Sequence, residues 1–212
     1  MKTLRMALVG FAVLAPSAMA QTWEFGGGVG GGFYPSSDIT SSAGSASAKI
    51  QMGLAGSVWV GNSWQSHWSG ELRYDYGMGD LALSSGSTTA TFAARTQQFH
   101  YDFMWHATPS ESRIRPYLSA GAGIKLYQGI GAQQAYQPLS NVALLTQQQD
   151  LTPLISAGGG VKFQLAQHVQ LRFDVHDYIS TFPKNVITPN IGAKTGRIMQ
   201  DIVPMIGISY TN

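Results

Sequence analysis

The chain of 212 residues contains no cysteine. This absence excludes a disulfide framework, a thiolate zinc site and a lipid anchor attached through cysteine. Charged residues are also scarce, because they make up 11% of the chain, whereas a soluble domain carries roughly a quarter. So low a charge content indicates that something other than water covers much of the surface.

The chain also lacks an apolar run long enough for a membrane-spanning helix, which needs about 20 such residues. Its best candidate, Met6 to Leu14, follows the basic residues Lys2 and Arg5 and precedes Ala18-Met19-Ala20. A basic start, a short apolar run and a small-x-small site are typical of a cleaved signal peptide. We therefore predict a signal peptide over residues 1–20 and one domain over residues 21–212.

The mature chain has no excess of either charge. Cleavage would remove Lys2 and Arg5, so the 13 basic residues fall to 11 and equal the 11 acidic ones. No cluster of lysine and arginine remains to neutralise phosphates, so no nucleic-acid partner is expected. The five histidines show no metal-site spacing, and no metal or other cofactor is expected. The 25 glycines fit β structure better than helices, in which each glycine costs about 1 kcal/mol.

Apolar and polar residues alternate along several segments, as they do when the two faces of a strand meet different environments. In the clearest case, from Ala48 to Val58, one face carries Ile50, Met52, Leu54, Gly56 and Val58, and the other carries Lys49, Gln51, Gly53, Ala55 and Ser57. Similar patterns cover residues 68–78, 98–105, 118–126, 154–165 and 169–177, with weaker ones near 23–33 and 202–210. These eight segments predict an all-β fold, an eight-stranded antiparallel up-and-down transmembrane β-barrel.

The connections alternate between long and short. Long ones cover residues 34–47, 79–90, 128–152 and 180–199, and short ones cover 61–66, 107–114 and 166–168. An even-stranded barrel with both ends in the periplasm requires this alternation, and its long connections face outside the cell. Their serine, glycine, glutamine and proline content predicts mobile, solvated loops. Pro204 cannot donate to a ladder, so we expect a bulge there or pairing that begins after it.

The alternation assigns two sets of residues. Charged residues on the polar face are predicted to fill the narrow interior as an ion-paired plug, because eight strands leave room for little besides side chains. This plug set is Glu71, Arg73, Asp75, Asp102, Lys125, Lys162, Arg172 and Asp174. Aromatic residues at strand ends are predicted to form an interfacial girdle. The girdle set is Trp23, Phe33, Trp59, Trp68, Trp105, Tyr127 and Tyr210.

Alternation alone does not say which face points inward. A secreted lipocalin-like barrel would turn its apolar face inward around a ligand, and its other face would then be an ordinary charged surface. The polar face here is instead glycine-rich, with few and balanced charges, which favours the membrane barrel. Within that barrel, the glycines of residues 26–32 are predicted to leave space for the long inward side chains of neighbouring strands.

Two segments resemble a known family. Arg115-Pro116-Tyr117-Leu118-Ser119-Ala120-Gly121-Ala122-Gly123 opens one strand, and Leu171-Arg172-Phe173-Asp174-Val175-His176-Asp177-Tyr178 lies near the end. With the strand pattern, they make essentially the whole mature chain similar to outer-membrane β-barrel domains of the OmpA-like, OmpX-like and opacity types. The resemblance implies a monomer in the bacterial outer membrane. It also implies outer-membrane lipid and lipopolysaccharide, the barrel-assembly machinery, periplasmic chaperones and an extracellular ligand as partners.

The preferred function that follows from the resemblance is not enzymatic. We expect a role in envelope integrity, or in surface interaction through the extracellular loops. A narrow channel or small-solute porin is the alternative, because the interior charges could also form a polar path for ions. An outer-membrane lipid-modifying enzyme is a third reading, suggested by His176 between Asp174 and Asp177, with Ser180 nearby. On a strand, however, His176 and Asp177 face opposite sides.

Overall fold

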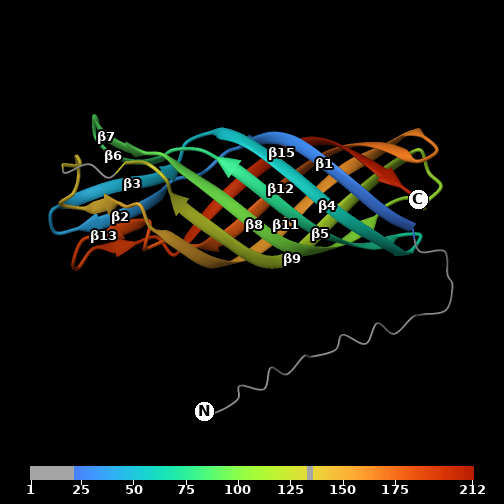
Figure 1. Cartoon of the computed structure of the whole chain (residues 1–212). Coiled ribbons are helices and arrows are strands. Elements are labelled where there is room, and N and C mark those ends of the chain that lie inside the picture. The colour runs from blue at the N-terminus through green and yellow to red at the C-terminus, as the bar shows by residue number, and fades with distance from the viewer. Residues whose placement is uncertain (1–21, 133–135) are drawn as a thin grey trace, which may run out of the picture.

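The computed structural model describes residues 22–132 and 136–212. The predicted signal peptide, residues 1–20, therefore lies outside the described residues. No helix in these two ranges is long and apolar enough to cross a membrane. The described chain is built from β-strands and turns (Figure 1).

Eight strands close into one antiparallel barrel, which confirms the predicted fold class. They are β1 (Thr22–Gly32), β4 (Gly53–Gln65), β5 (Trp68–Met78), β8 (Ala94–His106), β9 (Ile114–Gly129), β11 (Gln149–Ala166), β12 (Val169–Thr181) and β15 (Ile198–Thr211). Each pairs with the next barrel strand along the chain, and β1 pairs with β15 to close the wall. The topology is therefore up-and-down, and alternating residues on each strand face the inside and the outside of the barrel.

The described parts of the four long connections, which were predicted as mobile, solvated loops, contain regular strands. They contain seven short strands: β2 (Ser37–Ser41), β3 (Gly44–Ile50), β6 (Leu81–Ser85), β7 (Thr88–Phe92), β10 (Ala143–Leu145), β13 (Ile187–Pro189) and β14 (Lys194–Thr195). Five of them form a sheet in the order β14-β2-β3-β6-β7, and β10 pairs with β13. Figure 1 shows this part, here called the extension, beyond the end of the barrel that lies opposite the C-terminus.

A hydrophobic core holds the extension together. All four long connections contribute to it, through buried residues such as Ile39, Leu83, Leu145 and Ile187, each 1% exposed or less. Glycine sets the tight turn between β6 and β7, where Gly86 has a φ of 57°, a conformation that residues with a side chain adopt at a cost. Because the connections share one core, they fold as a unit on top of the barrel.

The predicted strand from Ala48 to Val58 is divided between the two parts. Ala48 and Ile50 belong to β3 and point into the core of the extension, whereas Leu54 and Val58 belong to β4 and are 70% and 58% exposed on the barrel surface. The prediction that Ile50 faces outward and Lys49 inward was therefore wrong, since Lys49 is exposed. Even-numbered residues face the core up to Ile50 and face outward from Met52 onward. The change falls between the end of β3 and the start of β4.

Pro204 interrupts one ladder and not the other. On one side, β15 pairs with β12 without a register shift from Ile198 to Tyr210. On the other, continuous pairing with β1 extends from Thr211 to Met205, and beyond Pro204 a single bridge joins Ile202 to Phe33. Of the two alternatives expected at Pro204, a bulge or pairing that begins after the proline, the second describes the ladder with β1. The physical reason is that proline has no N–H to donate.

Candidate functional site

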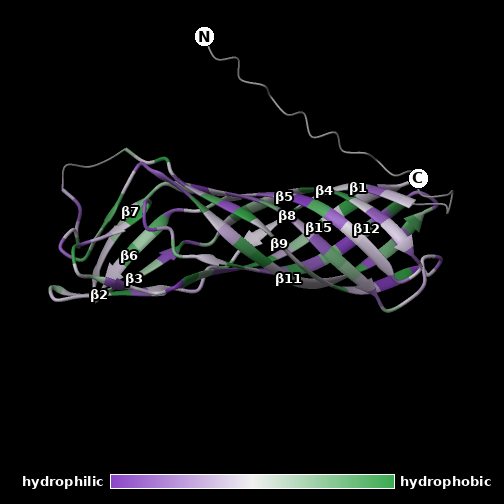
Figure 2. Ribbon diagram, turned by 90° about the horizontal axis from the view of Figure 1, so that it is seen from below, coloured by the Kyte–Doolittle hydropathy of each residue, from purple (hydrophilic) through white to green (hydrophobic). Residues whose placement is uncertain are grey.

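The interior of the barrel is the densest cluster of charged side chains in the described chain. All eight residues of the predicted plug set point into it, and each is 5% exposed or less. They come from β5, β8, β9, β11 and β12, on which the inward positions alternate with apolar residues on the lipid side. Figure 2 shows hydrophilic and hydrophobic residues alternating along these strands.

Arg172 organises the half of the lumen nearer the termini. Its guanidinium binds both carboxylate oxygens of Glu71, and its Nε donates to Asp174 Oδ2 and to the Tyr117 hydroxyl, both at 2.6 Å. Arg73 reaches the same Asp174 oxygen at 3.1 Å. Two cations are thus held against two carboxylates, the arrangement that buried charges require.

Trp59 lies inside this cluster, so its prediction as a girdle residue was wrong. Its side chain is buried, and its ring faces the guanidinium carbons of Arg172 and Arg73 at 4.7 and 5.1 Å. A Cβ on Gly26 would lie 2.4 Å from the ring, and one on Gly207 would lie 2.5 Å from it. Glycine on the neighbouring strands therefore makes room for the indole, which matches the role predicted for this glycine-rich segment.

A second cluster occupies the middle of the lumen around His100. Its two ring nitrogens lie 3.0 Å from Asp75 and 3.0 Å from Asp102. Ionised carboxylates only accept hydrogen bonds, so this geometry suits an imidazolium that donates from both nitrogens. Tyr178 donates a further hydrogen bond to Asp75 at 3.0 Å.

A lysine–carboxylate pair lies near each end of the lumen. Lys162 pairs with Glu24 on the side of the termini, and Lys125 pairs with Asp201 on the side of the extension. Tyr127 also points inward, where its hydroxyl lies 2.7 Å from Ser180 Oγ, so its prediction as a girdle residue was wrong too. Sequence reasoning left Glu24 and Asp201 out of the plug set, although both share a face with inward residues.

The charges of the lumen nearly balance. Five cationic side chains, counting His100, meet six carboxylates there: Arg73, Lys125, Lys162, Arg172 and His100 against Glu24, Glu71, Asp75, Asp102, Asp174 and Asp201. These groups bridge strands on opposite sides of the barrel. The arrangement can therefore tie the wall together across its interior while it fills the space through which ions would pass.

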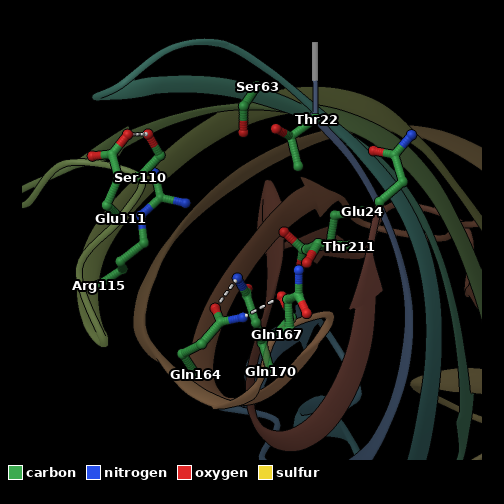
Figure 3. A pocket seen from close by; sticks show the side chains of 11 residues that line it. Thr22, Glu24, Ser63, Ser110, Glu111, Arg115, Gln164, Gln167, Gln170 and Thr211 are labelled. Atoms are coloured by element: carbon green, nitrogen blue, oxygen red, sulfur yellow. Dashed lines mark hydrogen bonds between the residues drawn. The ribbon is translucent and has the colours of Figure 1, made fainter. Parts of the chain in front are cut away.

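A polar cavity opens at the end of the barrel where β1 begins and β15 ends (Figure 3). Glu24 lies at its base, and Arg115 lines its side, where it donates to the Ser66 carbonyl at 3.2 Å. Gln170 donates to Gln164 at 2.9 Å on the opposite side. Glu24 joins this cavity to the ion pairs of the lumen, because it lines the cavity and also pairs with Lys162.

The other five residues of the girdle set lie on the outside of the barrel. Trp23, Phe33, Trp68, Trp105 and Tyr210 are between 42% and 53% exposed. Trp64, which sequence reasoning missed, is exposed near the β4–β5 turn, and its ring lies 5.9 Å from that of Phe103. Its position five residues after the inward Trp59 was the available signal, because an odd spacing along a strand changes the face.

The residues that suggested a lipid-modifying enzyme are not brought together into a catalytic group. His176 is buried in the lumen, where its Nδ1 lies 3.6 Å from Asp102 and 3.4 Å from Ser156 Oγ. Ser180 bonds instead to Tyr127, and Asp177 accepts a hydrogen bond from Gln200. A serine nucleophile must be reached by its substrate, whereas the predicted Ser180 is 3% exposed and Ser156, the serine beside His176, is 1% exposed.

Comparison with known proteins supports the architecture. The family model "Outer membrane protein beta-barrel domain" matches residues 6–195. No curated protein sequence matches the chain.

Two solved structures share the fold. Neisserial surface protein A is similar over 89% of this chain and 96% of its own, with 10% identity and a TM-score of 0.54. The outer membrane protein OprG from Pseudomonas aeruginosa is similar over 90% of this chain and 95% of its own, with 14% identity and a TM-score of 0.56. At such low identity the likeness concerns the fold alone.

Proposed function

The chain belongs to the family of outer-membrane β-barrel domains and is located in the bacterial outer membrane, and on that premise we propose that it is a non-enzymatic surface protein. Its barrel anchors the protein and contributes to the integrity of the envelope. Its extension presents a folded surface to ligands outside the cell. The observation that carries this proposal is the contrast between a lumen closed by ion pairs and an extension with a core of its own.

The plug supports anchoring rather than conduction. Arg172 and Arg73 span the lumen beside Trp59, and the side chains of all three are 3% exposed or less. A path for ions would require these groups to separate, which leaves buried charges without partners and costs several kcal/mol. The plug therefore favours a barrel that acts as a support over one that acts as a pore.

The outer surface of the extension supports ligand binding through hydrogen bonds. A groove of about 420 Å³ crosses β2, β3 and β6, a size within the range of roughly 300–1,000 Å³ seen for ligand sites. Hydroxyl groups dominate its lining, through Thr40, Ser45, Ser47 and Ser84, with Asp38 as the one charged member. Such a lining fits a ligand rich in hydroxyl or amide groups, such as a glycan, better than a strongly charged one.

The same proposal covers the assembly of the protein. A closed wall leaves no barrel strand without neighbours, so we propose that the protein is a monomer surrounded by outer-membrane lipid and lipopolysaccharide. Its insertion would require periplasmic chaperones and the barrel-assembly machinery, as the resemblance implies.

Planar-bilayer recording of the purified protein tests the proposal against the channel alternative. We expect no steady single-channel current from the folded barrel. A reproducible conductance would overturn the anchoring role and establish the channel. Mass spectrometry of lipid A from cells with and without the protein tests the enzyme alternative, and a lipid modification that depends on the protein would overturn the non-enzymatic role.

A further inference from the structure

The wall of the molecule is open between two of its ladders. The β1–β4 ladder ends at the pair Gly32–Gly53, and the β2–β3 ladder begins at the pair Ser37–Ala48. No backbone hydrogen bond joins residues 33–36 to residues 49–52, all of which the structure describes. Pro35 has no N–H to offer, and the N–H of Gln51 donates to the Asp80 carbonyl on its other side.

A groove of about 450 Å³ lies in this break on the outside of the wall, within the size range of ligand sites of roughly 300–1,000 Å³. Its apolar lining comes from Phe33, Met52 and Ile202, which are 45%, 69% and 37% exposed. Tyr34 also lines the groove, and its hydroxyl lies against the position that a Cβ on Gly32 would take. Burial raises the pKa of Tyr34 to about 12, so its hydroxyl is uncharged at neutral pH.

The groove lies at the outer edge of the apolar band. Trp23 marks the lower edge of that band on β1, and Phe33 follows ten residues later on the same side of the wall. At about 3.3 Å per residue and a tilt of about 40°, ten residues rise roughly 25 Å, which is the height of the apolar band of such barrels. Phe33 therefore lies where acyl chains end and headgroups begin.

Lys49 places a positive charge at this level. It lines the groove, its side chain is exposed, and no carboxylate within the described ranges lies within 4.0 Å of its ammonium group. The groove thus combines an apolar strip on the bilayer side with a free cation on the headgroup side. This order matches a phosphorylated lipid in the outer leaflet, whose acyl chains and headgroup meet at the same level. A soluble apolar ligand or a polypeptide would not be positioned by the edge of the bilayer in this way.

We propose that this groove is a specific site for a phosphorylated outer-leaflet lipid of the lipid A type. An acyl chain lies along Phe33, Met52 and Ile202, and a headgroup phosphate lies at Lys49. The inference needs only the outer-membrane location and does not depend on whether the extension binds extracellular ligands or the lumen conducts. The lipid site can therefore be disproved while the proposed function stands, and the proposed function can be disproved while the lipid site stands.

Native mass spectrometry of the folded protein, purified in non-ionic detergent, tests the site. The probes are diphosphoryl lipid A and the same lipid without phosphates. We expect the unmodified protein to retain one molecule of diphosphoryl lipid A and to bind the dephosphorylated form about fivefold more weakly, the effect of one lysine at an anionic surface. Lys49→Gln should remove this preference, and Lys49→Arg should keep it.

Two further variants separate the site from general lipid binding. Met52→Gln should weaken the binding of both lipids, because it makes the acyl strip polar without changing the charge. Lys184→Gln changes an exposed lysine outside the groove and should bind like the unmodified protein. The absence of a phosphate preference in the unmodified protein, or an equal loss in Lys184→Gln and Lys49→Gln, would overturn the proposal. A gel shift on boiling verifies that each variant is folded.

Discussion

The barrel and the extension are built from the same kind of strand with opposite chemistry. Inside the barrel, Arg73 and Arg172 are 1% exposed or less, while Val58 on its outer surface is 58% exposed. Inside the extension, Ile39 and Leu83 are fully buried, and serine and threonine cover its outer surface. The difference follows from the solvent on each outer surface, which is lipid around the barrel and water around the extension.

The change from one chemistry to the other can be followed along β7 and β8. Their inward residues keep the same parity, and they change from Ala90, Phe92 and Ala94 to Thr96 and Gln98. The boundary thus lies within two residues of Ala94. It follows that burial stabilises the two parts by different means, through apolar contact in the extension and through paired charges and hydrogen bonds in the lumen.

The largest expected effect comes from filling the space that glycine leaves in the barrel wall. A Cβ on Gly30 would lie 2.1 Å from the Pro204 carbonyl oxygen, so Gly30→Leu forces two paired strands apart. We expect this variant to fail to assemble, measured as loss of the gel shift on boiling after refolding into lipid vesicles. Gly28→Leu should also hinder folding, but less, because its Cβ position lies 2.9 Å from the nearest backbone oxygen.

The neighbouring glycine provides the matched control. A Cβ on Gly31 meets its nearest atom at 3.7 Å, which is an ordinary contact. Gly31→Leu should therefore assemble with the gel shift of the unmodified protein. Normal assembly of Gly30→Leu would show that the wall can spread at Pro204.

Arg172→Met should have the next largest effect, because it leaves Glu71 without its main buried partner. Breaking one side of a buried ion pair costs about 3–5 kcal/mol. We expect a loss of this size in the free energy of unfolding, measured by urea titration in lipid vesicles with tryptophan fluorescence, and no new conductance. Arg197→Met, on an exposed residue of the extension, should change it by less than about 0.5 kcal/mol.

The combined variant Arg172→Met with Glu71→Leu sharpens the test, since it removes both charges of the pair. It should recover part of the loss, because an apolar pair replaces a buried charge that has no partner. A double variant less stable than Arg172→Met alone would contradict the role of Arg172 as the partner of Glu71.

Alternation along the strands predicted the barrel and the burial of the eight plug residues, because it depends on local geometry alone. The same alternation contained the correct positions of two residues that were assigned to the girdle. Trp59 follows the outward Val58 directly, and Tyr127 shares its parity with the inward Lys125. Parity fixes which face of a strand a residue lies on, whereas location at a strand end does not, so strand-end location alone placed both residues on the wrong face.

The extension could not be predicted in the same way, because periodicity separates two faces without saying which one is inside. Residues 48–58 keep their apolar residues at even positions throughout, so nothing in the pattern marks the point where Ile50 faces inward and Leu54 outward. That point depends on where lipid gives way to water. Alternation on both sides of Gly86 was a local signal that this connection contains a hairpin.

Leu83→Ala should destabilise the extension and leave the barrel intact. Leu83 is fully buried in the shared core, and truncation of a buried leucine costs about 2–5 kcal/mol. Hydrogen exchange should rise in residues 37–50 and 81–92, while the gel shift on boiling is retained. Leu144→Ala, on a residue 41% exposed beside that core, is the matched control with little change. Loss of the barrel's gel shift in Leu83→Ala would show that the two parts fold as one unit.

The smallest expected effect comes from placing the same charge on the two outer surfaces. Val58 pairs with Gly27 near the middle of the apolar band, so Val58→Arg should cost about 2–4 kcal/mol, the penalty of arginine at the bilayer midplane. Leu144→Arg puts the charge into water and should change the free energy of unfolding by less than about 0.5 kcal/mol. Val58 and Leu144 are both exposed side chains. The difference between the two variants therefore reports whether lipid or water surrounds each position. Equal effects in urea titration would mean that lipid does not cover Val58, and the membrane boundary inferred from Ala94 would have to move.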